Sequence, residues 1–450
     1  MLANETAPRA LGLDFGTTNT VLSWAHPHRP AEPVVFNFLS NRLFSFRSAL
    51  CFWDEGDENQ PRVRHDAGPW AIQRFLEMAG DCRFIQSLKS FAASRLFEST
   101  NVYGRGFRFE DLFSAFFKSL RGHATPQLEH LPRDVIVGRP VEYVGSRPDP
   151  ALAMQRYELA LAPFGFERIR QVYEPVAAAF FFAQSLEESA TVLVADFGGG
   201  TTDFSVISFD VQAKGLRAQA LGHAGVGVAG DRFDYRIIDR VVLPQLGKGT
   251  AYRSMGKSLE LPRSCFASFA NWHELSIMKG SRDFRELKEV AVFSEAPELV
   301  GRFVKLVESD QGYRLYKAVS DAKEALSREE SARFSFEGPG FRIESDITRA
   351  QFEEWIAEEL AAIEATLDKV LANASLGAGD VDRVFLTGGS SFVPAVRAIF
   401  ERRFGADRVE AGNEFVSIAN GLATIGLRDD VDAWIVAPQA QPATARRAAR

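Results

Sequence analysis

The chain contains 450 residues, which is too long for one simple hydrophobic core and predicts two or three packed subdomains. Charged residues make up 25% of it and hydrophobic residues 46%, values typical of globular proteins, so wholesale disorder is excluded. The net charge of −7 offers no general attraction to nucleic acid or to acidic membrane surfaces, and we expect neither as a partner.

Cysteine usage and hydropathy narrow the class further. Cys51, Cys82 and Cys265 are far apart and form no CxxC pair, which argues against structural zinc and against a disulfide framework. The first residues do not have the basic-then-apolar pattern of a secretory signal, and no apolar run approaches the roughly 18 residues that span a bilayer. We therefore expect a cytoplasmic protein, with most of its 38 phenylalanines in cores.

The first half of the chain predicts a hairpin and two helices, followed by a second hairpin. Residues 11–25, LGLDFGTTNTVLSWA, form two β-rich runs around a polar turn. Apolar residues recur at spacings of three and four over residues 109–120, and residues 174–188 predict a helix buried between layers. Residues 191–209, TVLVADFGGGTTDFSVISF, repeat the first hairpin pattern, which indicates two related halves.

The second half is dominated by predicted helices. Residues 243–308 follow no clean pattern, and we expect a separate helical subdomain there. A capping-box pattern at Thr348 and Gln351 begins a long helical region over residues 347–374. A strand over residues 384–386 then leads through TGGSS into a helix that begins near Pro394, and residues 438–450 predict a frayed tail.

Both hairpin turns carry residue types that bind phosphate. Backbone N–H groups in a glycine-rich turn can converge on phosphate oxygens. Gly198-Gly199-Gly200 with Thr201-Thr202 is one such turn, and residues 16–19, GTTN, are the other. Such a hairpin can also be only a tight turn, but three glycines weaken a strand connection unless they have a use. Asp14 and Asp196 end the preceding strands, where their carboxylates suit Mg²⁺.

In this order, LGLDFGTTN, VADFGGGTTD and VFLTGGSSFVP resemble the ATPase domain of the 70-kilodalton heat-shock chaperones (Hsp70), within the actin and sugar-kinase superfamily. IVGRP, VYEPVAAAF, GVAGDRFD and ITRAQFEEW resemble further segments of that family, from about Leu11 to Leu427. In detail the chain is similar to the shorter, YegD-type heat-shock-like proteins. The resemblance implies an α/β, actin-like ATPase fold of two lobes, each around a ribonuclease-H-like mixed sheet, with the nucleotide in the central cleft.

The resemblance also implies a site for ATP or ADP with Mg²⁺. Asp14 and Asp196 would hold the metal ion through its waters, and Lys89, in QSLKSF, would orient the γ-phosphate and the attacking water. The alternative for Lys89 is a solvated surface lysine. The predicted catalytic residues are Lys89, Glu174, Asp196 and Asp203, and the predicted nucleotide-binding residues are Asp14, Gly16, Thr17, Thr18, Asn19, Gly198, Gly199, Gly200, Thr201, Gly230, Lys323, Gly388, Gly389 and Ser390.

Some positions depart from the family pattern. Ser320 and Glu324 stand where the family has a glutamate and an arginine at its adenine site, and Phe392 replaces an arginine that often stacks on the base. An aromatic ring can still stack there, but these changes weaken the prediction of strict adenine selectivity. Pro140 corresponds to the switch proline of the family, and we expect Arg156 to be its partner.

The expected organisation is a first lobe over residues 1–190 and a second over residues 191–427, with the helical subdomain at 243–308 and an adenosine motif at 384–397. Residues 428–450 would be a C-terminal tail, with no substrate-binding domain. We expect ATP binding and slow Mg-dependent hydrolysis in a chaperone-like switch that acts with an unknown protein client or co-chaperone. Two alternatives stay open: a small-molecule kinase of the same superfamily, for which no aspartate base beside a sugar pocket is evident, and an actin-like scaffold.

Overall fold

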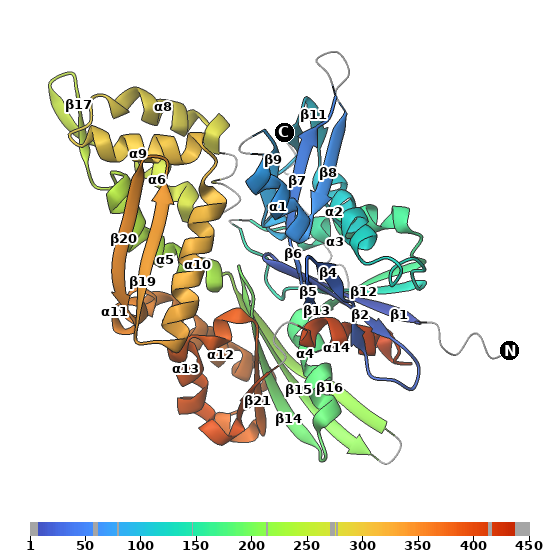
Figure 1. Ribbon diagram of the computed structural model, residues 1–450. Helices are drawn as coiled ribbons and strands as arrows, with labels where there is room; N and C mark the ends of the chain where they lie inside the picture. Colours follow the sequence, from blue (N-terminus) through green and yellow to red (C-terminus); the bar gives the residue numbers. More distant parts are fainter. Residues whose placement is uncertain are drawn as a thin grey trace, which may run out of the picture.

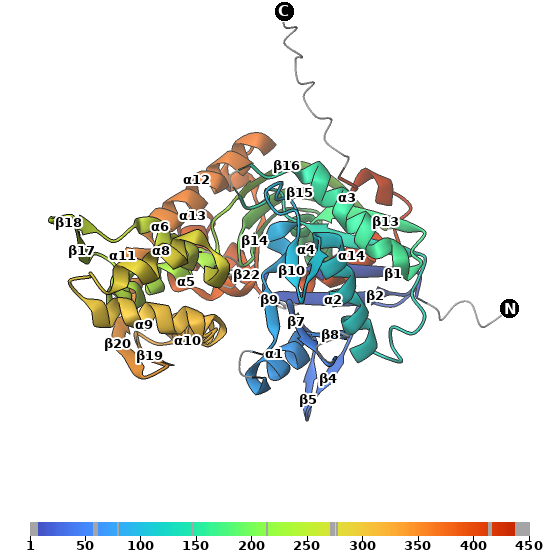
Figure 2. The ribbon, with the colours of Figure 1, turned by 90° about the horizontal axis from the view of Figure 1, so that it is seen from above.

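The computed structural model describes residues 8–56, 62–78, 81–145, 147–212, 215–270, 275, 278–412 and 416–436. Its framework is a pair of mixed β-sheets, one from each half of the sequence (Figure 1). Smaller sheets and helices extend each half away from these central layers (Figure 2). The architecture is mixed α/β, as the sequence predicts.

The first sheet consists of β1 (Ala10–Phe15), β2 (Asn19–Ala25), β3 (Glu32–Pro33), β12 (Asp134–Arg139) and β13 (Arg168–Tyr173), and β6 (Phe46–Arg47) pairs with β2. The order is β13-β12-β1-β2-β3. β1, β2 and β3 run antiparallel to one another, whereas β12 and β13 on the other side of β1 run parallel to it. The first predicted hairpin is therefore confirmed as β1–β2.

The second sheet consists of β14 (Ala190–Phe197), β15 (Thr202–Gln212), β16 (Gly215–Val226), β21 (Arg383–Thr387) and β22 (Val409–Ala411). Its order is β16-β15-β14-β21-β22, with three antiparallel strands followed by two parallel ones. The second predicted hairpin is confirmed as β14–β15. The two sheets share strand order and direction, so the hairpin repeat in the sequence reflects a repeat of whole sheets.

Outer elements of the first half pack on its sheet through phenylalanines. The predicted helix is α2 (Phe109–His123), and all its periodic apolar residues are buried. Phe15 of β1 meets Phe113 of α2 edge-on, with ring centroids 4.6 Å apart. The other outer elements are β4 (Phe36–Phe38), β5 (Asn41–Leu43), β7 (Ala49–Asp54), β8 (Val63–Ala67), α1 (Gly68–Glu77), β9 (Arg83–Gln86), β10 (Thr100–Val102), β11 (Arg105–Phe107) and α3 (Pro150–Leu161).

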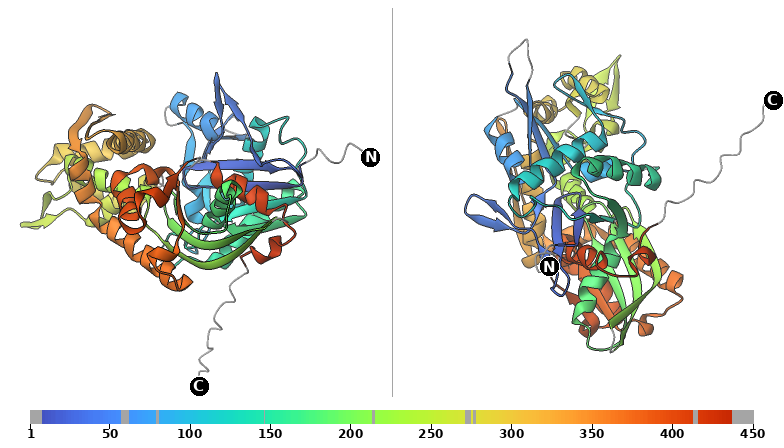
Figure 3. Two further views of the ribbon diagram at one scale, coloured as in Figure 1. Left: turned by 90° about the horizontal axis from the view of Figure 1, so that it is seen from below. Right: turned by 90° about the vertical axis from the view of Figure 1, so that its right-hand side faces the viewer.

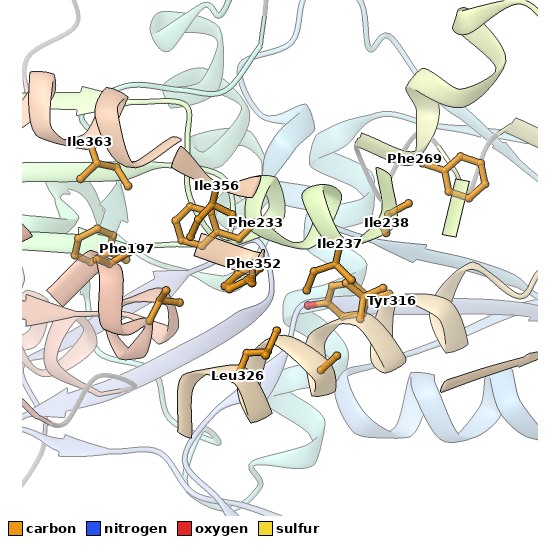
Figure 4. Close-up of a cluster of buried hydrophobic side chains, with 14 of the residues drawn as sticks. Phe197, Phe233, Ile237, Ile238, Phe269, Tyr316, Leu326, Phe352, Ile356 and Ile363 are labelled. Carbon is orange, nitrogen blue, oxygen red and sulfur yellow. The ribbon is translucent and has the colours of Figure 1, made fainter. Parts of the chain in front are cut away.

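Outer elements of the second half form one large apolar core together with residues of its sheet, and Figure 4 shows part of this core. The region over residues 243–308 contains helices, as predicted, but also a β-hairpin, β17–β18, that the sequence pattern did not indicate. The elements outside the sheet are α5 (Gly230–Ile237), β17 (Ala251–Ser254), β18 (Lys257–Glu260), α6 (Arg263–Ala267), α8 (Arg282–Ala291), α9 (Pro297–Glu308), α10 (Gly312–Arg328), β19 (Ser331–Gly338), β20 (Phe341–Thr348), α11 (Arg349–Trp355), α12 (Ala357–Ala374) and α13 (Pro394–Phe404).

Two buried helices, α4 (Glu174–Phe182) and α14 (Ser417–Ile425), pack against each other between the two sheets (Figures 1 and 3). α4 packs on β14 and β15 of the second sheet, and α14 packs on β1, β2 and β12 of the first. Each helix thus lies on the sheet of the opposite half. Together with inward residues of both sheets they form a third core that belongs to neither half alone.

Local predictions at helix ends have mixed outcomes. The capping box at Thr348 and Gln351 is confirmed, as is the helix start at Pro394. The long helix predicted over residues 347–374 is instead broken at Ile356 into α11 and α12. The predicted tail, residues 438–450, lies outside the described residues. Within the described part of the chain, no helix is long and apolar enough to cross a membrane.

Candidate functional site

A cavity of about 580 Å³ lies between the two halves and is lined by the turns of both hairpins. Asp14 and Asp196 occupy equivalent places near the ends of β1 and β14, so the repeated topology brings both to this cavity. Asp203 is the one predicted site residue that does not line it. Those that do are Asp14, Gly16, Thr17, Thr18, Asn19, Lys89, Glu174, Asp196, Gly198, Gly199, Gly200, Thr201, Gly230, Lys323, Gly388, Gly389 and Ser390.

The two glycine-rich turns face each other across a narrow gap. Each is closed by a backbone hydrogen bond of 2.9 Å, from the N–H of Gly16 to the Asn19 carbonyl and from the N–H of Gly198 to the Thr201 carbonyl. A Cβ placed on Gly199 would lie 3.2 Å from the Thr18 hydroxyl oxygen. A side chain there would narrow the gap, and this explains the glycine at that position.

Lys89 and Glu174 form a buried ion pair at the end of the cavity that the two glycine-rich turns line, here called the phosphate end. Lys89 lies on a 3₁₀ turn, η1 (Leu88–Phe91), and its Nζ is 2.5 Å from Oε1 of Glu174, the first residue of α4. Burial lowers the pKa of Lys89, but the charges of Glu174 and Asp14 outweigh it and raise the pKa overall. With its side chain 11% exposed, Lys89 is not the solvated surface lysine of the alternative interpretation.

Three aspartates surround this pair. Burial and the charge of Glu174 raise the pKa of Asp14 to about 7, against the opposing charge of Lys89. Burial, followed by the charges of Glu174 and Asp14, raises the pKa of Asp196 well above its usual value. Burial raises the pKa of Asp203 to about 7. Such an array of desolvated carboxylates is costly for the fold and typical of functional sites.

Asp203 lies near the start of β15, directly after the second turn. Its Oδ1 accepts hydrogen bonds from the backbone N–H groups of Val141 at 2.8 Å and Glu142 at 3.1 Å. These two residues follow Pro140 in the loop after β12. Asp203 therefore ties the β14–β15 hairpin of the second half to a loop of the first half.

The other end of the cavity is built around Lys323 on α10. Its Nζ lies 2.8 Å from Oδ1 of Asp234, and it donates to the Gly230 carbonyl at 3.3 Å. Gly388 starts the turn after β21 with φ +84°, and a Cβ on it would overlap the carbonyl of Phe197. Only glycine meets both requirements easily, since other residues are strained at positive φ.

The carboxylates fit a hydrated divalent cation. A cation beside Asp14 and Asp196 would offset their mutual repulsion. Among the described residues, no group of three or more His, Cys, Asp or Glu side chains is arranged to hold a metal directly. Asp14 and Asp196 offer carboxylate oxygens, the type of ligand that Mg²⁺ takes in proteins.

The predicted pairing of Arg156 with Pro140 is wrong. Arg156 instead donates to the backbone carbonyls of Phe91, Ala92, Ser94 and Phe97 at 2.7–3.1 Å. It thereby fixes the chain directly after η1, the turn that carries Lys89. The Pro140 carbonyl accepts a hydrogen bond from its own neighbour, Arg139, at 3.2 Å.

The positions that depart from the family pattern all line the cavity. Ser320 and Glu324 lie on α10 beside Lys323, and Phe392 is 50% exposed on the turn after β21. Arg328, one helical turn after Glu324, also lines the cavity and forms a 2.7 Å ion pair with it. An arginine is thus present at this end, displaced by one turn of the helix.

Sequence reasoning did not identify several lining residues. Arg47, near the first turn, lies over the ring of Tyr316 on α10, with its guanidinium 5.9 Å from the ring centroid. Asp231 and Tyr143 also line the cavity. Asp231 belongs to the quoted segment GVAGDRFD and could have been found there. Arg47, Tyr143 and Tyr316 carry no local signal, because the fold alone brings them together.

The repeated sheets and the shared cavity define a two-lobed, actin-like ATPase fold. The family model described as Hsp70 protein matches residues 108–249 and 306–427, well over half of the chain. The chain therefore belongs to the Hsp70 family.

Individual relatives are distant and longer. The chain is 25% identical over 436 residues to the chaperone protein DnaK of Deinococcus radiodurans, covering 92% of this chain and 59% of that protein. Identity and coverage are the same for the DnaK of Deinococcus deserti. The stromal 70 kDa heat shock-related protein of Pisum sativum, a chloroplastic protein, is 22% identical over 431 residues, with 92% and 52% covered. The chain thus spans somewhat over half the length of these relatives.

Proposed function

We propose that the chain binds ATP and ADP with Mg²⁺ in this cavity and hydrolyses ATP slowly, as a chaperone-like nucleotide switch. The observation that carries the proposal is the buried Lys89–Glu174 pair between the two glycine-rich turns. A buried ion pair adds little net stability to a fold, because the cost of removing two charges from water offsets their attraction. Phosphoryl transfer, in contrast, requires a positioned cation and carboxylates. Membership of the Hsp70 family supports the same proposal.

Each part of the cavity has a role in this proposal. Backbone N–H groups of residues 17–19 and 199–201 would bind the β- and γ-phosphates, while those of Gly16 and Gly198 close the turns. Lys89 would orient the γ-phosphate and the attacking water. Asp14 and Asp196 would hold Mg²⁺ through its waters, which supplies charge neutralisation at the phosphates. Glu174 would keep Lys89 in place, and Asp203 would hold the second turn against the loop after Pro140.

The nucleoside would occupy the other end. Gly230, Lys323, Gly388, Gly389 and Ser390 would surround the ribose and base. The ring of Phe392 offers a stacking surface for the base. Stacking accepts any purine, so this part of the proposal expects weaker selection for adenine than for the phosphates.

The direct test is binding of ATP, ADP and AMP by titration calorimetry with and without Mg²⁺. We expect ATP and ADP to bind much more tightly than AMP, because the two turns converge where the β-phosphate would lie. Gly199→Val should abolish binding by filling the gap between the turns. Gly227→Val is the matched control, since open space surrounds Gly227. Absence of binding at millimolar nucleotide, with the fold intact by circular dichroism, would overturn the proposal.

The switch part of the proposal concerns a protein partner. Both halves contribute to the site, so nucleotide exchange would change the closure between them. We expect a protein client or co-chaperone to be captured by an ATP-locked form and not by an ADP-locked form, or the reverse. Phosphorylation of an added sugar would favour the kinase alternative, and sedimentation with ATP would favour the actin-like scaffold. The YegD-type relationship and cytoplasmic localisation stay predictions from the sequence.

A further inference from the structure

Tyr143 presents a buried hydroxyl that the protein itself does not use. It lies in the loop after β12, lines the cavity and is 7% exposed. Among the described residues, its Oη has no hydrogen-bond partner. Buried hydroxyls almost always have a partner, so an exception at the wall of a cavity indicates a ligand atom as the partner.

The surroundings of Tyr143 fix its ring and leave its hydroxyl without a partner among the described residues. The ring packs against the guanidinium of Arg139, 5.0 Å from the ring centroid. The residues on either side of Tyr143 contact the second glycine-rich turn and its support: the Glu142 N–H donates to Asp203 at 3.1 Å, and a Cβ on Gly200 would lie 2.9 Å from Cγ2 of Val144. Burial, the largest influence, raises the pKa of Tyr143 to about 12. The hydroxyl therefore stays protonated at neutral pH and can donate a hydrogen bond.

We propose that Tyr143 is a further catalytic residue, whose hydroxyl donates a hydrogen bond to an oxygen of the transferred γ-phosphoryl group beside Lys89. This inference rests on the proposed ATPase function. A neutral donor held in advance at the position of charge stabilises the transition state without any reorganisation. It also complements Lys89, whose charge is already shared with Glu174.

Loss of the hydroxyl from a tyrosine with only a structural role should not change ATP hydrolysis, and Tyr157 allows this comparison. Tyr157 of α3 is also fully buried, and its Oη also has no partner among the described residues. Its ring packs among Phe15, Phe109 and Phe113, and it does not line the cavity. Removing this hydroxyl changes a buried polar atom of the same kind without touching a ligand.

The experiment compares Tyr143→Phe and Tyr157→Phe with the wild-type chain in three measurements: Mg-ATP affinity, single-turnover ATP hydrolysis and thermal unfolding without nucleotide. For Tyr143→Phe we expect hydrolysis to fall about 10- to 100-fold and affinity to stay within about threefold. Its unfolding midpoint should not fall, because an unsatisfied buried hydroxyl is lost. Tyr157→Phe should hydrolyse ATP at close to the wild-type rate.

Specific results would overturn the inference. Hydrolysis of ATP by Tyr143→Phe at the wild-type rate would do so. A parallel loss of Mg-ATP affinity and hydrolysis rate would also do so, because it would mean that the hydroxyl contributes only to binding of ATP in the ground state. An equal loss in Tyr157→Phe also contradicts it, because that loss would come from packing. If the wild-type chain binds no ATP, the proposed function itself fails. If it binds ATP without measurable hydrolysis, the binding proposal stands and the role of Tyr143 is refuted.

Discussion

Replacing Lys89 with methionine tests how strongly the buried Lys89–Glu174 ion pair affects the free energy of unfolding. Two unit charges 2.5 Å apart interact by about 7 kcal/mol at an effective dielectric constant of about 20. Desolvation offsets part of this energy in the intact pair. In Lys89→Met, Glu174 stays buried beside Asp14 without its counter-charge, and we expect a loss of about 3–5 kcal/mol in the free energy of unfolding.

The second half of the prediction is recovery. Lys89→Met combined with Glu174→Gln removes both charges, so the unpaired carboxylate disappears and most of the lost stability should return. Lys317→Met is the matched control, because Lys317 makes an ion pair with Asp321 at the same 2.5 Å distance but with both side chains more than half exposed. That exposed pair should contribute less than about 1 kcal/mol.

The assay is urea unfolding without nucleotide, followed by circular dichroism and tryptophan fluorescence for the two single variants, the double variant and the control. The reasoning is refuted if Lys89→Met is as stable as the wild type, or if the effects of Lys89→Met and Glu174→Gln simply add. ATP turnover is a separate readout. We expect Lys89→Met to bind Mg-ATP but to hydrolyse it about 100- to 1,000-fold more slowly.

Three other predictions concern single residues. Burial raises the pKa of Asp203 from 3.8 to about 7, so the folded chain holds a proton there that the unfolded chain releases between these pH values. The stability of the wild type relative to Asp203→Asn should therefore fall as pH rises from about 4 to 7, by up to about 1.4 kcal/mol per pH unit. Thermal unfolding of both proteins at pH 5 and 7.5 measures this difference, and a relative stability that rises with pH would contradict the prediction. Gly388→Ala combines φ +84° with overlap on the Phe197 carbonyl and should cost at least about 1–2 kcal/mol, whereas Gly389→Ala, in open space, should unfold like the wild type. Phe392→Ala should weaken Mg-ATP binding by about 1 kcal/mol in a competition assay, and unchanged affinity would remove the ring from the nucleoside end.

Local patterns predicted the parts of this fold whose signals lie close together in sequence. The two Asp-Phe-Gly hairpins, the phenylalanine face of α2 and the capping box before α11 each depend on neighbours within one element. The hairpin β17–β18 escaped prediction because its strands are short and mostly exposed, and so lack alternating apolar residues. The break at Ile356 also lacks a local signal, since no glycine or proline marks it.

For the site, sequence motifs predicted the walls but not how residues from different elements meet. Lys89 lies in an unremarkable polar stretch, and only the fold brings it against Glu174, 85 residues later. Arg156 was assigned to Pro140 by position along the chain, but its hydrogen bonds go to carbonyls that become clustered only when the segment after Lys89 curls around it. Such partners depend on tertiary distances, which spacing along one sequence does not encode.

The exchange of α4 and α14 between the two sheets has a consequence for folding. If the chain were cut near residue 190, the N-terminal fragment would contain the first sheet but lack α14, the helix that packs on it. The C-terminal fragment would contain the second sheet but lack α4, which packs on that sheet. Each fragment would expose an apolar sheet face to water, so neither is a complete folding unit. The two halves should therefore unfold in a single cooperative transition, and fragments mixed together should complement each other where each alone aggregates.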